Sequence, residues 1–155
     1  MRWVLSAYSR AYFHLGYIDL EEENPDSALR HLEASLKLEP SQPVTLCEMA
    51  LVHVTRGDHE KAIALYDQAL ETRPWISDSV RALALRGKGV RLIDLGDLDA
   101  AKSCLMESLR YAPGNEMAIN ELFLISNLKT GVETDRLTLE LRRSTSGEKR
   151  CEACG

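Results

Sequence analysis

A regular spacing of prolines constrains this chain more than any other feature of its sequence. Pro40, Pro74 and Pro113 each close a segment of similar length. The first two are separated by about 34 residues, which is the length of one pair of antiparallel helices in a repeat protein. Counting back from each proline by twelve, eight and twenty-four positions returns similar residue types in all three copies: Ala28, Ala62 and Ala101; Leu32, Tyr66 and Leu105; Gly16, Ala50 and Gly89. The sequence therefore predicts a stack of helical hairpins.

Two glycines fall inside predicted helices and need a structural reason. Glycine in a helix interior costs about 1 kcal/mol relative to alanine. We expect Gly16 and Gly89 to let a second helix approach closely, with Ala28 and Ala101 supplying the matching small surface. No stretch alternates with period two over enough residues to predict a sheet.

Turn signals separate the two helices of each predicted hairpin. In the second and third copies, a glycine that tolerates the left-handed conformation precedes a helix-capping aspartate. In the first copy, an asparagine cap precedes a proline at the first helical position. These pairs are Gly57-Asp58, Gly96-Asp97 and Asn24-Pro25.

The third copy is longer than the second, because Pro113 follows Pro74 at a greater separation than Pro74 follows Pro40. The extra segment, residues 75–79, runs into the strongly helix-forming stretch that begins at Val80. A segment of this length corresponds to about 1.4 helical turns. We therefore predict a lengthened first helix in the third copy, with a longer loop as the alternative.

Residues 116–129 show a fourth apolar-periodic pattern, preceded by Asn115 as a helix cap. We expect this helix to seal the open end of the third copy with Ile119, Leu122 and Phe123. A further short helix capped by Asp135 is expected to finish the stack or to fold back into the concave groove of the stack.

The repeated positions resemble the tetratricopeptide repeat, whose pattern places an aromatic, Leu-Gly, Tyr, Ala, an aromatic and Pro at fixed offsets. The three copies carry this pattern as Tyr12, Leu15, Gly16, Ala28, Leu32 and Pro40; as Leu46, Met49, Ala50, Ala62, Tyr66, Ala69 and Pro74; and as Leu85, Gly89, Leu92, Ala101, Leu105 and Pro113. The chain departs from the pattern at Asp19 and His53, where the family prefers Tyr, and at Lys88, where it prefers Leu. The resemblance implies an all-α fold, a right-handed superhelical stack of antiparallel helix pairs.

The expected domain organisation follows from the same register. We predict one helical repeat domain over residues 1–143, with repeats at about 9–42, 43–76 and 77–115 and capping helices over 116–143. From residue 144 the composition turns polar and small, which predicts a disordered tail over residues 144–155.

Composition limits the partners and the location of the chain. Its 155 residues carry a net charge of -5, which disfavours nucleic acid as the main ligand. The sequence has no apolar run long enough to predict membrane insertion, and its first residues are too polar for a secretion signal. We therefore expect a cytoplasmic protein.

The resemblance implies a concave surface lined by the first helix of each pair. Common offsets along these helices give twelve candidate groove residues, nine of them apolar or aromatic: Arg10, Phe13, Tyr17, Leu20, Val44, Cys47, Leu51, Val54, Leu83, Arg86, Val90 and Ile93. A contiguous apolar groove is unusual on a monomer. We expect an extended peptide or an amphipathic helix of another protein to cover it. The alternatives are coverage by the chain's own tail and coverage by a second copy in a homodimer.

Members of the family that bind chaperones hold a C-terminal carboxylate with a clamp of lysine, asparagine and arginine side chains. Here the first copy offers Arg10 and His14, the asparagine position of the second copy carries Glu48, and the third copy has Leu83 and Gly87. A carboxylate needs cationic or amide donors, and Glu48 repels it. The sequence therefore predicts that this clamp is absent.

No pattern typical of a catalytic site occurs, and we expect neither an enzyme nor a cofactor. The four histidines show no metal-ligand spacing, so surface or packing roles are expected for them. Cys151 and Cys154 have the spacing of half a zinc site or of a redox pair, but no second pair follows before the sequence ends. The sequence thus favours a non-catalytic adaptor that binds a partner protein in its groove. Two alternatives stay open: a metal- or redox-responsive protein that uses this cysteine pair, and a small secretion-type chaperone that grips apolar client segments.

Overall fold

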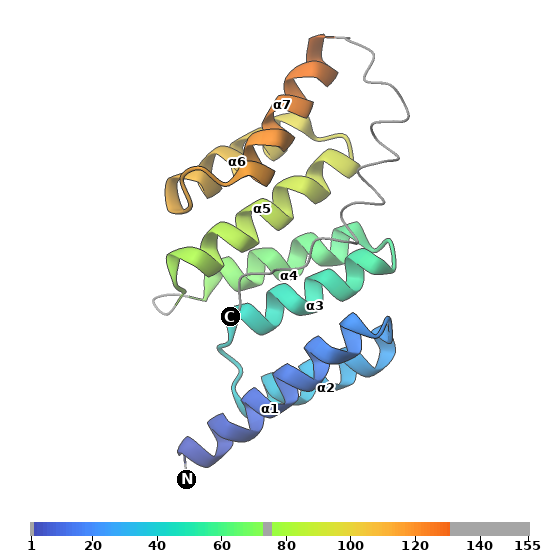
Figure 1. Ribbon diagram of the computed structural model, residues 1–155, viewed down its shortest axis with the longest axis vertical. Coiled ribbons are helices and arrows are strands. Elements are labelled where there is room, and N and C mark those ends of the chain that lie inside the picture. The colour runs from blue at the N-terminus through green and yellow to red at the C-terminus, as the bar shows by residue number, and fades with distance from the viewer. Residues whose placement is uncertain (1, 73–75, 131–155) are drawn as a thin grey trace. The chain divides into compact units, whose positions relative to one another are not determined.

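A computed structural model describes residues 2–72 and 76–130 of the chain (Figure 1). All regular structure in these residues is helical, and the helices follow one another as α1 (Arg2–Glu21), α2 (Pro25–Leu38), α3 (Pro43–Thr55), α4 (His59–Glu71), α5 (Asp78–Asp94), α6 (Leu98–Tyr111) and α7 (Glu116–Thr130). This confirms the predicted all-α repeat stack. The expected helix capped by Asp135 and the predicted tail from residue 144 lie outside the described residues.

The chain divides into two compact units, Met1–Leu122 and Phe123–Gly155. The first unit holds three helix pairs, because α1 packs on α2, α3 on α4 and α5 on α6. Successive pairs pack through α2 against α3 and through α4 against α5. The first helices of the pairs also touch, α1 against α3 and α3 against α5, so α1, α3 and α5 lie in a row within this unit (Figure 1).

The two helical glycines lie where the sequence predicts close approach. A Cβ atom at Gly16 would come within 2.7 Å of Leu32 Cγ and 3.2 Å of the Ala28 carbonyl oxygen. At Gly89 the corresponding distances are 2.8 Å to Leu105 Cγ and 3.3 Å to the Ala101 carbonyl oxygen. Each of these two hairpins therefore closes at the same register, with a large apolar side chain of its second helix filling the space above the glycine.

The hairpin turns use two different devices to reach the left-handed conformation. Gly57 and Gly96 have φ angles of 78° and 85°. The equivalent residue of the first copy is Glu23, which reaches φ 59° without being glycine. Asp97 Oδ1 caps α6 by accepting a hydrogen bond from the Ala100 N–H at 3.1 Å. The three hairpins thus share a left-handed turn residue despite different residue types.

The extra segment of the third copy lengthens its first helix, as predicted. The α5 helix begins at Asp78 and has 17 residues, whereas α3 has 13. Ser77 caps α5, since its hydroxyl oxygen accepts a hydrogen bond from the Val80 N–H. Ile76, just before this cap, is buried.

The prediction for α7 is wrong at two of its three residues, Ile119 and Phe123, whereas the third, Leu122, is half-buried. Ile119 and Phe123 are exposed, with 47% and 66% of their surfaces accessible, whereas Ala118, Leu124 and Ile125 are buried. Asn115 does cap this helix, since its side-chain oxygen accepts a hydrogen bond from the Ala118 N–H at 3.0 Å. The apolar residues of α7 occur on several sides, so their periodicity did not identify the buried one.

Candidate partner-binding groove

The candidate groove lies on the row formed by α1, α3 and α5. Ten of its twelve predicted residues have exposed or half-buried side chains: Arg10, Phe13, Tyr17, Val44, Leu51, Val54, Leu83, Arg86, Val90 and Ile93. The other two, Leu20 and Cys47, are only 6% and 1% exposed.

The assignment of Leu20 and Cys47 to a partner-binding surface therefore needs correction, because both belong to the core. Leu20 is clustered with Ala28 and Leu32 of its own hairpin and with Val52 of α3. The Cys47 side chain lies in a second cluster that joins α3, α4 and α5. In both cases the neighbouring hairpin covers a position that a common offset had placed on the open face.

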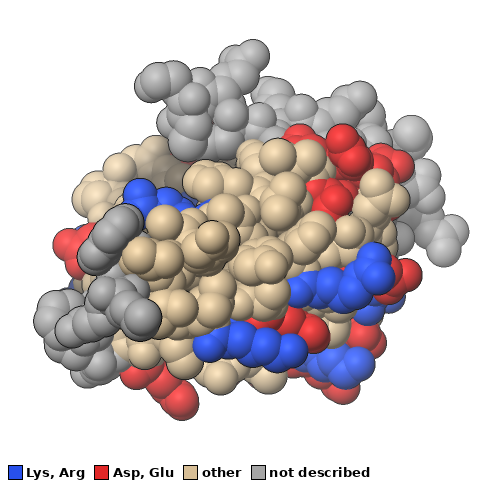
Figure 2. All heavy atoms as spheres, turned by 90° about the horizontal axis from the view of Figure 1, so that it is seen from below, with Lys and Arg blue, Asp and Glu red and all other residues tan. Residues whose placement is uncertain are grey.

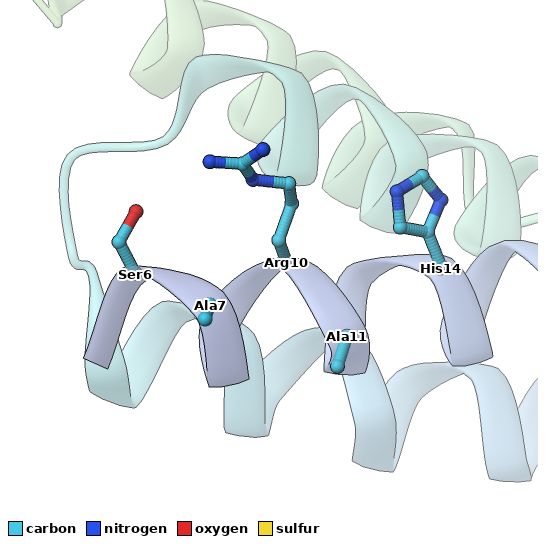
Figure 3. A pocket seen from close by; sticks show the side chains of 5 residues that line it. All are labelled: Ser6, Ala7, Arg10, Ala11 and His14. Atoms are coloured by element: carbon cyan, nitrogen blue, oxygen red, sulfur yellow. The ribbon is translucent and has the colours of Figure 1, made fainter. Parts of the chain in front are cut away.

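At the N-terminal end of the row, α1 lines a pocket of about 470 Å³ with Ser6, Ala7, Arg10, Ala11 and His14. Ser6, Arg10 and His14 follow one another at four-residue spacing, so they share one side of the helix, and their side chains point to the same side in Figure 3. The twelve-residue prediction included only Arg10 of this group. His14 was named only among the clamp positions, and the four-residue spacing from Arg10 is the signal that identifies both His14 and Ser6.

Two of the positions on which the prediction of an absent carboxylate clamp rests are Glu48 of α3 and Gly87 of α5. At the asparagine position stands Glu48, whose side chain is 9% exposed. In the third copy, Gly87 contributes no side chain, and a Cβ there would collide with the ring of Tyr66. The Tyr66 ring comes from α4 and is 2% exposed, and burial raises the pKa of its phenol. The space that a basic clamp residue needs is therefore filled by an aromatic ring of the preceding hairpin.

The third copy adds positive charge at a partly buried position. Burial lowers the pKa of the Arg86 guanidinium, while the nearby Tyr66 opposes this shift. Two positions further along, Lys88 donates a hydrogen bond to Asp67 Oδ1 at 2.5 Å. Burial lowers the pKa of Lys88, but the Asp67 carboxylate outweighs this effect, so the net shift is upward. Lys88 stands where the family prefers leucine, and its charge is paired across α4 and α5.

The titratable groups of the described residues show no arrangement typical of a metal or nucleophilic site. No group of three His, Cys, Asp or Glu side chains there is placed to hold a metal ion. Burial raises the pKa of the Cys47 thiol to about 12, with the Glu48 charge adding to the shift. A thiol with so high a pKa is inert, because the thiolate is the reactive form. Cys151 and Cys154 lie outside the described residues.

Three of the histidines lie beside carboxylates. His31 Nδ1 is 2.6 Å from Asp19 Oδ2, and this pair joins α1 to α2. His53 lies 3.5 Å from Asp58, and His59 lies 3.5 Å from Asp94.

Over the part of the chain that the structure covers, none of the helices is long and apolar enough to cross a membrane.

Known proteins resemble this chain in sequence and in fold. The photosystem I assembly protein Ycf3 of Cyanophora paradoxa is 26% identical over 117 residues, which is 68% of each chain. The first TPR of Spaghetti (RPAP3), solved bound to the HSP90 peptide SRMEEVD, superposes with a TM-score of 0.73 at 20% identity and covers 81% of this chain and 95% of its own. The TPR2AB domain of yeast Sti1, solved as a pHSP90 complex, gives a TM-score of 0.75 at 18% identity; the match covers 82% of this chain and 49% of that chain.

Models of the tetratricopeptide repeat match residues 19–89 and 88–115, which together span more than half of the chain. The matched residues include most of the glycine, alanine and proline positions that set the hairpin register. The chain belongs to the tetratricopeptide repeat family.

Proposed function

We propose that this chain is a non-catalytic protein-interaction module that holds an extended segment or an amphipathic helix of a partner along α1, α3 and α5. The observation that carries the proposal is the row of half-buried apolar side chains on these three helices, which includes Tyr17, Leu51 and Val90. Such side chains form a surface that an apolar peptide segment can cover.

The comparisons favour the same class of function. The Spaghetti domain, which has the same fold, holds a peptide of another protein. Ycf3, which resembles the chain over 68% of its length, is an assembly protein. A chain that assists assembly must hold partner segments that are still uncovered, and these are apolar because they become interface or core later.

The charges of the groove define what the partner carries. Arg10 and Arg86 place positive charge at its first and third copies, while Glu48 places an acidic side chain between them. We therefore expect a partner segment with apolar side chains along its length and an acidic residue near Arg10. A free C-terminal carboxylate is not the main recognition element, because Glu48 and Gly87 replace the donors that it requires.

Peptide selection followed by binding measurements tests this proposal. Peptides selected from a random library on the full chain are labelled and titrated with it, and the acidic peptide SRMEEVD serves as the comparison. We expect the selected peptides to be apolar and to bind at least about tenfold more tightly than SRMEEVD, which is about 1.4 kcal/mol. Tighter binding of SRMEEVD contradicts the proposed role of the apolar row.

Matched variants connect the binding to the groove. Leu51→Glu combined with Val90→Glu places two charges in the row and is expected to weaken peptide binding about 100-fold, since each carboxylate is desolvated without a partner. Met106→Glu, at an exposed position of α6, is the control that adds charge elsewhere. If the double variant keeps its helix content and still binds the peptide as the wild type does, the groove is not the binding site.

A further inference from the structure

The outer side of α1 exposes a broad apolar surface at the N-terminal end of the repeat stack. The exposed fractions are 46% for Leu5, 60% for Tyr8, 36% for Tyr12, 44% for Leu15 and 49% for Ile18. Ala11, between these residues, is also exposed. Figure 2 views the molecule from the end at which α1 and α2 lie in Figure 1, and it shows a broad area without Lys, Arg, Asp or Glu, with the charged residues around it.

The internal repeat shows what this surface is built to contact. Positions equivalent to Ala11, Tyr12 and Ile18 occur in α3, where they are almost completely buried: Thr45 at 0%, Leu46 at 4% and Val52 at 0%. In α5, the equivalents of Ala11 and Tyr12 are Ala84 at 0% and Leu85 at 5%. The preceding hairpin packs there, through α2 on α3 and through α4 on α5. On α1 these positions are open, so this side of the helix has the chemistry of a helix–helix contact.

We propose that the outer side of α1 binds the outer side of α1 in a second copy of this chain, with the two helices antiparallel. Val4, Tyr8, Ala11, Leu15 and Ile18 are spaced four, three, four and three positions apart, which is the seam of a left-handed helix pair. We call these five residues the α1 seam. None of them carries a charge, so a second copy meets no like-charge repulsion along it. A contact between identical surfaces also closes into a two-fold dimer.

The orientation follows from the ends of α1. The helix begins at Arg2 and ends at Glu21, with Glu22 and Glu23 next in the chain. A parallel pair brings these acidic ends together. An antiparallel pair instead keeps the two acidic ends apart and also opposes the two helix dipoles. Ala11, in the middle of the seam, is small enough for the two helices to come close at the two-fold axis.

The α1 seam is separate from the proposed groove. Tyr17 of the groove follows Tyr8 of the seam by nine positions, which is about two and a half helical turns, so the two side chains leave α1 in opposite directions. Dimer formation and peptide binding are therefore distinct properties, and each can fail without the other.

Sedimentation velocity of the full chain tests the dimer. We expect the wild type to pass from monomer to dimer between about 5 and 200 µM, in the range of a small interface. Tyr8→Glu combined with Leu15→Glu is expected to raise the dimer dissociation constant about 100-fold or more, because the seam then buries unpaired carboxylates. Met106→Glu combined with Met117→Glu changes the net charge equally at residues that are 54% and 51% exposed, and it is expected to leave the dimer unchanged.

Cross-linking tests the orientation. In a background where Cys104, Cys151 and Cys154 are replaced by serine, Ala11→Cys is expected to form a disulfide between two copies under mild oxidation. Glu22→Cys in the same background is the control, because it lies eleven positions, or about 16 Å, from Ala11 along the helix direction. Antiparallel helices keep the two Glu22 positions far apart, and no cross-link is expected there.

The proposal is overturned by any of three results. These are a wild type that stays monomeric at every concentration, a Tyr8→Glu and Leu15→Glu variant that dimerises as well as the wild type, and a cross-link at Glu22→Cys in place of Ala11→Cys. Circular dichroism of each variant establishes that its helices are intact, and both substituted seam positions are exposed enough for glutamate to leave the monomer folded.

Discussion

At the scale of single residues, Glu23 adopts a left-handed backbone conformation, and the residues at the two equivalent turns that adopt it are both glycines. Its φ of 59° lies in the left-handed region, as do those of Gly57 and Gly96. A residue with a Cβ atom pays about 1–2 kcal/mol for this conformation. Because the same turn occurs in three copies of one chain, the glycine turns serve as a reference for the turn at Glu23.

We therefore expect Glu23→Gly to stabilise the protein by about 0.5–1 kcal/mol, once the greater chain entropy of glycine in the unfolded state is subtracted. Gly57→Ala, at the equivalent turn, is expected to destabilise by about 1 kcal/mol for the converse reason. Urea unfolding of the three proteins measures both effects. A loss of stability in Glu23→Gly contradicts this account of the first turn.

A second prediction at this scale concerns the buried thiol of Cys47. Burial raises its pKa to about 12, so the thiolate is scarce at neutral pH. We expect N-ethylmaleimide at pH 8 to leave Cys47 unmodified in the folded protein and to modify it after unfolding in urea. Peptide mass mapping measures both states, with Cys104, which is half-buried, as the internal comparison. Rapid labelling of Cys47 in the folded chain contradicts the burial of its side chain in the core.

At the scale of the helices, the glycines of α1 and α5 determine how closely their hairpins close. Helix propensity alone predicts that Gly16→Ala stabilises the chain by about 1 kcal/mol. Packing predicts the opposite sign, because the new methyl group meets Leu32 Cγ at 2.7 Å and the Ala28 carbonyl oxygen at 3.2 Å. We expect a net destabilisation of about 1–3 kcal/mol, as for other overpacked cores. The sign of the change in the free energy of unfolding decides between the two effects.

The link between α1 and α2 makes part of the stability depend on pH. Hydrogen bonds from Ser27 and from His31 hold the pKa of Asp19 below its usual value. The unfolded chain then binds more protons than the folded chain in the acidic range, so the free energy of unfolding falls as the pH drops below about 5. We expect Asp19→Asn to flatten this dependence between about pH 5 and pH 3. Thermal melts across that range, for wild type and variant, give the two slopes, and equal slopes contradict the role of this pair.

At this scale, the sequence predictions that depend on local rules succeeded, and the prediction of which side of α7 is buried did not. The hairpin register, the capping by Asn115 and the extension of α5 follow from local rules, namely small residues at close contacts, turn glycines and helix caps. The buried side of α7 does not follow from local rules, since Ile119 and Ile125 are equally apolar but only Ile125 is buried. The hydrogen bonds between Ser9 and Ser35, which join α1 to α2 through residues far apart in the chain, were likewise invisible in the sequence.

At the scale of the whole molecule, the groove and the α1 seam are proposed as two separate surfaces of the first unit. The groove variant, Leu51→Glu with Val90→Glu, is expected to lose peptide binding and to keep the dimer. The seam variant, Tyr8→Glu with Leu15→Glu, is expected to do the reverse. Binding titrations and sedimentation velocity on the same two proteins measure this independence. Loss of both properties in either variant contradicts it and indicates that one surface serves both.

The sequence by itself determined the register of the helical hairpins in the described residues, because this register depends on local chemistry that recurs from one copy to the next. Only the tertiary structure decided which positions of a helix the adjacent hairpin covers. Leu20 and Cys47 share the offsets of open groove residues, yet the next hairpin buries them, while Tyr12 shares the offset of buried Leu46 and stays open. Burial at a given repeat position depends on which hairpins flank the helix. The first, middle and last copies have different flanking hairpins even where their residues are similar.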